Sequence, residues 1–222
     1  MNRIIYLNSL LRKYDTSNYL EIGVRNGENF FSINSKSKVG VDPEYFFSKR
    51  FFLKSLMKFH NWRFKMFRKT SDRFFEFDAP HIYKRNKVDV VFIDGMHTYT
   101  QSLKDAQNSL KFLSKDGVII FHDCNPQSPE AATPQLPQNA INWNGDVWKT
   151  IYHFRKLNEF FDCFTINADE GLGVLKPNNG DFLNALDNIR PDKEINNLTY
   201  QDLESNRVHY LGLRKPDLIS QA

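Results

Sequence analysis

The sequence of 222 residues contains few cysteines and no long apolar run. Its two cysteines, Cys124 and Cys163, are too few for a disulfide scaffold or a cysteine-ligated zinc site. No apolar stretch approaches the roughly 20 residues that a membrane-spanning helix needs. Residues 1–15 lack the continuous apolar segment and the small-residue cleavage site of a signal peptide. We therefore expect a cytoplasmic protein without a membrane span.

A strong excess of one charge is also missing. The chain has 30 basic and 26 acidic residues, and the resulting net charge of +4 does not by itself imply a nucleic-acid partner. The length, with 41% hydrophobic residues, is that of one ordinary globular domain, which we expect to span 1–222. We expect its core at about 18–176 and a C-terminal helical extension at about 180–222.

Short apolar runs alternate with segments of helical spacing along the chain. The runs are rich in β-branched residues and nearly continuous, as in strands buried on both faces of a parallel sheet. They lie at 18–23, 38–42, 63–67, 88–94 and 118–121, followed by a hairpin at 161–166 and 172–175. Helical segments are expected at 28–33, 46–59, 99–113, 146–157 and after Thr199. The alternation predicts an α/β fold, with helices on both faces of a parallel sheet and an antiparallel hairpin at its edge.

Polar residues stand where each predicted parallel strand ends. They are Glu21 to Gly23, Asp42, Thr70 to Asp72, Asp94 to His97, and His122 with Asp123. Any one of these groups could simply cap a helix or close a turn. Ligands of open parallel sheets bind beyond the carboxyl ends of the strands, so the five groups together favour a ligand site there.

The first of these turns carries two glycines but not a dinucleotide motif. Gly23 and Gly27 allow a tight turn and a close approach of a ligand to the backbone. The Gly-x-Gly-x-x-Gly pattern fails, because Arg25 and Glu28 stand where it needs glycine. Asp42 follows Gly23 by 19 residues and can accept hydrogen bonds from both hydroxyls of a ribose. A nucleoside without a diphosphate fits these features better than NAD.

Several motifs in this order and spacing resemble class I S-adenosylmethionine-dependent methyltransferases. They are EIGVRNG at 21–27, Val41-Asp42, FIDGMHTY at 92–99, Asp105 and GVIIFHD at 117–123. Within that class the chain is similar to the branch of macrocin-type sugar O-methyltransferases and cephalosporin-hydroxylase-like proteins. The resemblance covers about 18–176 and implies a Rossmann-like, doubly wound sheet of seven strands, mostly parallel, with the last strand antiparallel.

The resemblance implies S-adenosylmethionine as the cofactor and assigns cofactor contacts by position. These are Glu21, Gly23 and Gly27 at the methionine part, Asp42 at the ribose, Ser71 and Asp72 near the adenine, and Asp94 near the sulfonium. The common form of the first motif has glycine where this chain has Arg25. The Arg25 side chain must therefore point away from the cofactor or contact a carboxylate.

The expected reaction is O-methylation of a small molecule or of a sugar or glycan hydroxyl. A hydroxyl is a poor nucleophile at neutral pH, so a base or a metal is needed. Related enzymes hold a divalent metal such as Mg²⁺ at positions that correspond to Asp94, His122 and Asp123, with Asn125 nearby. His122 replaces an acidic residue of those relatives, which weakens the case for Mg²⁺. His97 or His122 is the alternative, as a catalytic base.

Residues 49–69 contain eight Lys or Arg and no acidic residue, with aromatic residues between them. This pattern suits single-stranded nucleic acid, a solvated helix face, or docking of an acidic carrier or glycan. A nucleic-acid methyltransferase is therefore an alternative function, although the Pro-Pro-aromatic motif of the amino-methylating enzymes is missing after Asp94. A cofactor-binding partner subunit without catalysis is a further alternative.

One long irregular stretch lies between the predicted fifth strand and the next helix. Residues 126–143 contain four prolines, at 126, 129, 134 and 137. Irregular segments of this length in compact domains are usually functional lids or disordered. We expect this one to close over the site when the acceptor binds. The sequence does not predict the acceptor itself or the oligomeric state.

Overall fold

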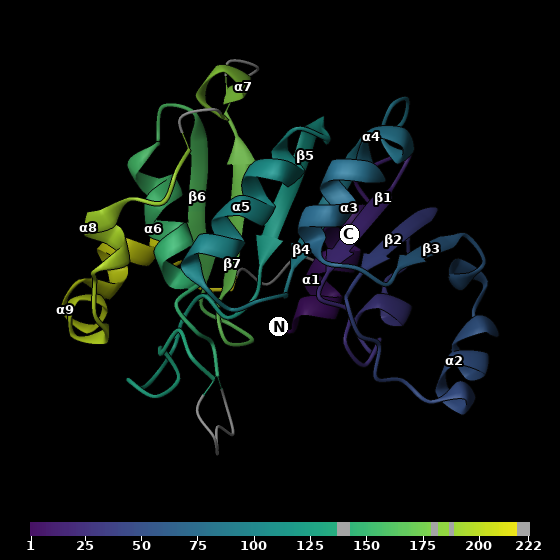
Figure 1. Ribbon diagram of the computed structural model, residues 1–222, viewed down its shortest axis with the longest axis horizontal. Coiled ribbons are helices and arrows are strands. Elements are labelled where there is room, and N and C mark those ends of the chain that lie inside the picture. The colour runs from purple at the N-terminus through teal and green to yellow at the C-terminus, as the bar shows by residue number, and fades with distance from the viewer. Residues whose placement is uncertain (137–142, 179–181, 187–188, 217–222) are drawn as a thin grey trace.

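The computed structural model describes residues 1–136, 143–178, 182–186 and 189–216. Within them, seven strands form one sheet in the order β3-β2-β1-β4-β5-β7-β6 (Figure 1). The strands are β1 (Asn18–Ile22), β2 (Ser37–Val41), β3 (Phe64–Phe67), β4 (Val88–Ile93), β5 (Leu113–Phe121), β6 (Phe161–Ile166) and β7 (Leu172–Pro177). The seven-stranded, mostly parallel sheet predicted from the sequence is confirmed.

The first five strands pair in parallel, and β7 is antiparallel to both of its neighbours. The last strand of the chain therefore inserts between β5 and β6, so that β6 forms the edge of the sheet. β5 begins at Leu113, earlier than the predicted start at 118, because Leu113 already pairs with Val88. The Lys115–Gly117 segment, which precedes the predicted strand, lies within β5, and the register shifts beside it.

Helices cover both faces of the sheet, as predicted. The α-helices are α1 (Arg3–Leu11), α2 (Lys49–Leu56), α3 (Ser71–Phe77), α4 (Ala79–Ile82), α5 (Tyr99–Leu110), α6 (Trp148–Lys156), α7 (Phe182–Ala185), α8 (Lys193–Asn196) and α9 (Tyr200–Leu211). One face packs α3, α4, α5 and α6 in a single apolar cluster. The other face packs α1 and the short 3-10 helix η1 (Phe30–Ser32).

The helix expected at 28–33 is reduced to the single turn η1. The buried Lys38 donates from Nζ to the backbone carbonyls of Phe30 and Ile33, at 3.0 and 2.7 Å. Asn61 donates to the carbonyl of Phe31 at 3.1 Å. These side chains take the carbonyl oxygens that a longer helix would need for its own ladder, which explains the early stop.

The expected start of a C-terminal helix is confirmed at α9. The Thr199 hydroxyl accepts from the backbone of Asp202, and the Asp202 carboxylate accepts from the backbone of Thr199, which makes a capping box. Leu203 and Leu211 pack with Trp148 of α6. Among the described residues, none of the helices is both long enough and apolar enough to span a lipid bilayer. Part of the expected lid, 137–142, lies outside the described residues.

Candidate active site

The turn after β1 touches the end of β4 directly. Gly23 has a φ of +88°, and its backbone N–H donates to the carbonyl of Val41 at 2.9 Å. A Cβ at this position would lie 2.0 Å from the carbonyl oxygen of Asp94. Only glycine fits so close a contact in this conformation. The predicted tight turn at Gly23 therefore sits against the residue that the sequence marks at the end of β4.

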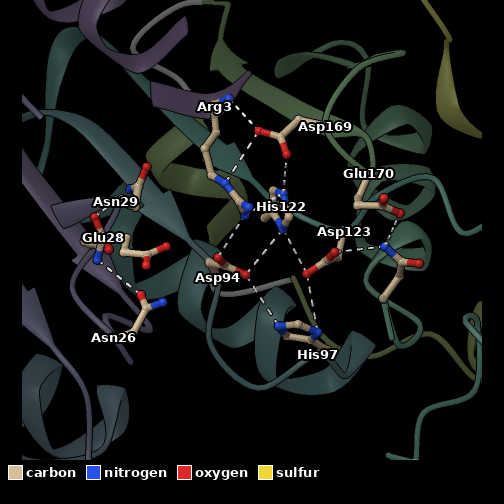
Figure 2. Close-up of polar contacts among 12 residues, drawn as sticks. Arg3, Asn26, Glu28, Asn29, Asp94, His97, His122, Asp123, Asp169 and Glu170 are labelled. Atoms are coloured by element: carbon tan, nitrogen blue, oxygen red, sulfur yellow. Dashed lines mark hydrogen bonds and ion pairs between the residues drawn. The ribbon is translucent and has the colours of Figure 1, made fainter. Parts of the chain in front are cut away.

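Two carboxylates and two imidazoles meet at the ends of β4 and β5 (Figure 2). The strands pair Ile93 with Phe121, so the residues that follow them become neighbours. His122 Nδ1 lies 3.0 Å from Asp123 Oδ2 and 3.5 Å from Asp94 Oδ1. His97 lies opposite, with Nε2 3.4 Å from Asp94 Oδ1 and Nδ1 3.4 Å from Asp123 Oδ2. The structure thus brings together the residues that the sequence predicts for catalysis and for a metal.

The ring of His97 is held in place by the segment that precedes α6. Its Nδ1 lies 3.0 Å from the carbonyl oxygen of Trp143, and the two rings stack with centroids 4.8 Å apart. A carbonyl can only accept, so Nδ1 carries the hydrogen and the neutral ring has its lone pair on Nε2. The backbone of His97 is fixed as well, because the backbone N–H of Asp146 donates to its carbonyl at 3.1 Å.

Arg3 and Asp169 complete the cluster from distant parts of the chain. Arg3 Nη1 donates to Nε2 of His122 at 2.7 Å and lies 3.5 Å from Asp94 Oδ2. The backbone N–H of Arg3 donates to Asp169 Oδ2 at 2.5 Å, and Asp169 Oδ1 lies 3.5 Å from His122 Nε2. The first turn of α1 therefore closes one side of the site, a role that the sequence does not predict.

An amide reaches Asp123, but it belongs to Asn144 rather than to the expected Asn125. Asn144 donates to Asp123 Oδ1 at 2.8 Å and to Glu170 Oε2 at 3.4 Å. The Asn125 amide instead donates to Asn167 at 3.0 Å and accepts from Arg207 at 2.7 Å. Asn125 is therefore turned away from Asp123, and the amide beside the predicted metal ligands is that of Asn144.

Burial and mutual pairing shift the pKa values in this cluster strongly. Burial alone would raise the pKa of Asp94, but the neighbouring imidazoles of His122 and His97 hold it well below its usual range. Burial alone would lower the pKa of His97, whereas Asp94 and Asp123 raise it above the usual value. The carboxylates of Asp123, Asp169 and Asp94 likewise overcome burial and raise the pKa of His122, to about 11. The hydrogen bond from Arg3 opposes this rise in the pKa of His122, because Nε2 can accept it only when the ring is neutral.

The donor set fits a divalent cation. One ligand atom from each of Asp94, His97 and Asp123 lies within 4.8 Å of the other two. The Nδ1 of His122 is buried, faces both carboxylates and makes no hydrogen bond of good geometry. Mixed carboxylate and imidazole ligands suit a borderline transition metal better than Mg²⁺, which prefers oxygen.

The residues predicted to bind the cofactor lie at the strand ends, most of them already held by protein partners. The Glu21 carboxylate is buried and accepts from the Tyr19 hydroxyl at 2.6 Å and from Asn29 at 2.8 Å. The carboxylate of Asp42 accepts from the backbone N–H of Arg25 at 2.8 Å. This contact with the backbone of Arg25 holds the first loop, while the Arg25 side chain is exposed.

Ser71 and Asp72 begin α3 and lie against α5. Gln101 of α5 donates to Ser71 at 3.2 Å, to Asp72 at 3.3 Å and to the buried Asp105 at 3.0 Å. Burial raises the pKa of Asp105 to about 7. Lys104 lies 2.7 Å from Asp72. This polar group joins the two helices, and it does not extend to the cluster around Asp94.

Residues 20–124 match the model of a family described as a methyltransferase domain. This part of the chain is therefore similar to a methyltransferase domain. The match begins in β1 and ends directly after Asp123, so it contains both strand ends of the site. No curated protein matches the sequence.

Solved structures of methyltransferases share the fold of the chain. A putative O-methyltransferase from Klebsiella pneumoniae superimposes with a TM-score of 0.60 at 12% identity, over 79% of this chain and 80% of that chain. An O-methyltransferase from Bacillus cereus with bound SAH superimposes with a TM-score of 0.54 at 15% identity, over 79% of this chain and 80% of that chain. TomG from Streptomyces achromogenes, an O-methyltransferase of tomaymycin synthesis bound to SAM, gives 0.53 at 14% identity, over 79% of each chain.

Proposed function

We propose that the protein transfers a methyl group from S-adenosylmethionine to a hydroxyl of a small molecule or sugar. One observation carries the proposal. The Gly23 turn of the methyltransferase domain touches Asp94, and Asp94 belongs to a cluster of two carboxylates and two imidazoles. A methyl donor seated on that turn would present its sulfonium to groups that can take a proton from a hydroxyl. The resemblance to macrocin-type enzymes in the FIDGMHTY and GVIIFHD motifs supports a sugar as the acceptor.

His97 is the base that this geometry supports best. The backbone carbonyl of Trp143 accepts a hydrogen bond from Nδ1, so the lone pair on Nε2 is available for the hydroxyl proton. Asp94 lies 3.4 Å from Nε2 and stabilises the imidazolium once the proton has moved. The carboxylates also raise the pKa of His97 above its usual value, which strengthens the ring as a base.

The transfer itself is an in-line displacement. As the hydroxyl proton moves to Nε2 of His97, the acceptor oxygen forms a bond to the methyl carbon and the bond from that carbon to sulfur breaks. The electron pair of that bond stays on sulfur, which leaves S-adenosylhomocysteine and a methyl ether. Alignment of the two molecules supplies several kcal/mol of the rate enhancement, about 7 or more in well-oriented cases.

A divalent cation is the alternative way to activate the hydroxyl. Asp94 and Asp123 would hold it, with His97 or His122 as the nitrogen ligand. When bound, such an ion would stabilise the acceptor oxygen as an alkoxide. A His97 side chain that ligates the ion through Nε2 cannot also serve as the base, so the two routes exclude each other at this residue.

Turnover with a panel of sugars and small hydroxyl compounds tests the proposal, with S-adenosylhomocysteine measured by mass spectrometry. We expect the His97→Gln variant to lose about 10²- to 10⁴-fold in kcat. The control His81→Gln replaces an exposed histidine of α4 and should keep full activity. Because the neutral ring is the base, the wild-type rate should rise with pH through a pKa above the ordinary value of 6.5.

A chelator separates the two routes. Full activity after exhaustive metal removal supports the His97 base, whereas activity that disappears and returns with Mn²⁺ or Mg²⁺ assigns the activation to a metal. No S-adenosylhomocysteine above background with any acceptor, together with no binding of S-adenosylmethionine, would contradict the proposed function.

A further inference from the structure

The segment after β2 presents a cationic surface with exposed apolar side chains. Between Glu44 and Asp72 the chain has eight Lys or Arg and no acidic residue. Among the described residues, Lys69 alone of these eight forms an ion pair, with Asp78 at 2.6 Å. We define the α2 face by six exposed residues, which are Leu53, Lys54, Met57, Lys58, Phe59 and Trp62. The apolar members are 64, 82, 79 and 64% exposed, in that order along the chain.

The opposite side of α2 is anchored to the protein by aromatic packing. Phe47, Phe51 and Phe52 surround the buried Phe31, with ring centroids 5.6, 6.0 and 5.8 Å from it. The Ser55 hydroxyl is buried and donates to the carbonyl of Phe51 at 2.9 Å. α2 therefore already has an apolar packing side, and the α2 face is a second apolar side, exposed to solvent and without a packing partner among the described residues.

The turn that carries Phe59 and Trp62 is held rigidly from inside. Asn61 of η2 (Phe59–Asn61) is buried and donates to the carbonyls of Phe31 and Ser55, at 3.1 and 2.8 Å. Its amide oxygen accepts from the buried ammonium group of Lys38. Asn61 is thus fixed on the inner side of the turn, while the side chains of Phe59 and Trp62 are exposed. The exposure of Phe59 and Trp62 is thus built into the fold.

We propose that the α2 face docks on an anionic lipid surface. Interfacial helices combine Lys and Arg with projecting Trp, Phe and Leu, so that the apolar side chains enter the headgroup boundary while the cations meet anionic headgroups. Leu53, Met57, Phe59 and Trp62 supply the apolar part, and Lys54 and Lys58 stand between them. The absence of acidic residues from 45–71 removes the repulsion that anionic lipids would otherwise meet.

The same surface fits single-stranded nucleic acid less well. Nucleic-acid platforms offer open ring faces on which successive bases stack. Here Phe59 and Trp62 stack on each other, with centroids 4.3 Å apart and an angle of 21° between the planes. The Trp62 Nε1–H is also engaged, by the carbonyl of Leu56 at 3.0 Å. Leu53 and Met57 are aliphatic and highly exposed, which suits acyl chains and not bases.

α2 lies at the same end of the parallel strands as the candidate active site. α2 stands at the lower right of Figure 1, at the end of the sheet where the loop after β5 also lies. Phe46, which is 66% exposed, donates from its backbone to the carbonyl of Arg25 at 2.8 Å. Docking through α2 would therefore bring the first loop and its exposed Arg25 toward the membrane surface.

Co-sedimentation of the full chain with vesicles tests this proposal without any methyl donor. We expect binding to phosphatidylcholine vesicles that contain phosphatidylglycerol and little binding to phosphatidylcholine alone. The Lys54→Glu/Lys58→Glu variant should lose about fivefold or more in partitioning for each cation removed. The Leu53→Ser/Met57→Ser variant should bind the vesicles about tenfold or more weakly, because less apolar area enters the interface. Lys84→Glu/Lys115→Glu and Val208→Ser are matched controls, because they change exposed residues elsewhere and should bind normally.

Tryptophan emission gives a second readout at the surface itself. Trp62 is exposed, Trp143 is half-buried beside His97 and Trp148 is buried, so vesicles that bind the α2 face should shift the emission to shorter wavelength through Trp62. The shift should disappear in Trp62→Phe while co-sedimentation remains. Equal binding to neutral and anionic vesicles, or no binding to either, would overturn the proposal. Binding to polyuridylate that the lysine variant loses and the Leu53→Ser/Met57→Ser variant keeps would also overturn it, in favour of nucleic acid. None of these outcomes bears on methyl transfer.

Discussion

Replacing Gly23 with alanine would place a methyl group where β1 and β4 meet. The new Cβ would lie 2.0 Å from the Asp94 carbonyl oxygen, 2.4 Å from its carbon and 2.7 Å from the Gly95 Cα. All three atoms belong to the backbone, so no side chain can rotate to make room. The φ of +88° adds conformational strain for any residue with a Cβ.

The two effects can be estimated separately. The left-handed conformation costs about 1–2 kcal/mol for alanine, and the added methyl in a tightly packed position costs about 1–3 kcal/mol more. We therefore expect Gly23→Ala to lower the free energy of unfolding by about 2–5 kcal/mol. Because the clash pushes on Asp94, the variant should also bind S-adenosylhomocysteine at least tenfold more weakly, which is about 1.4 kcal/mol.

Urea unfolding and titration calorimetry measure these two quantities. Gly95→Ala is the matched control, because its Cβ would come no closer than 3.4 Å, to the Ile22 side chain, and its φ is not in the left-handed region. We expect the free energy of unfolding of this control to stay within about 1 kcal/mol of that of the wild type. If Gly23→Ala unfolds at the same urea concentration as Gly95→Ala and binds the product equally well, the tight contact between the two strand ends is not what shapes the site.

Two further predictions concern Glu21 in β1 and Asp42 directly after β2. Burial raises the pKa of Glu21 to about 8, so the folded protein keeps a proton that the unfolded chain loses above its ordinary value of 4.5. The stability that this gives is fully present below 4.5 and is lost as the pH rises through 8, so Glu21→Gln should match the wild type near pH 4 and exceed it near pH 9 in urea unfolding. Equal slopes against pH for both proteins would show that Glu21 is ionised in the fold. Asp42→Ala should weaken S-adenosylhomocysteine binding about tenfold or more through loss of a charge-assisted bond, and unchanged affinity by calorimetry in a folded variant would exclude Asp42 as the ribose ligand.

The strands and the centre of the site could be predicted because their causes are local. Nearly continuous apolar runs such as 88–93 mark buried parallel strands, and the topology then makes their ends neighbours. Asp94, His97, His122 and Asp123 follow from this rule without any knowledge of contacts. The capping box at Thr199 is likewise a local signal, and it marked the start of α9 correctly.

The rest of the site depends on long-range packing that no short pattern records. Arg3 meets Asp169 across 166 positions of the chain, because β7 inserts between β5 and β6 and brings its turn over His122. The turn at 167–171 was recognisable, but not which site it would reach. The sequence also does not indicate that Asn144, and not Asn125, contacts Asp123. Arg207 of α9 binds the Asn125 side chain and keeps it away from Asp123.

A crystal structure with S-adenosylhomocysteine bound tests the central claim most directly. The account predicts the ribose hydroxyls on the Asp42 carboxylate, the methionine part along the Gly23 turn, and the sulfur facing Asp94 and His97. Electron density for the product at any other place, with none at the Gly23 turn and Asp42, would contradict the assignment of these strand ends as the site of methyl transfer.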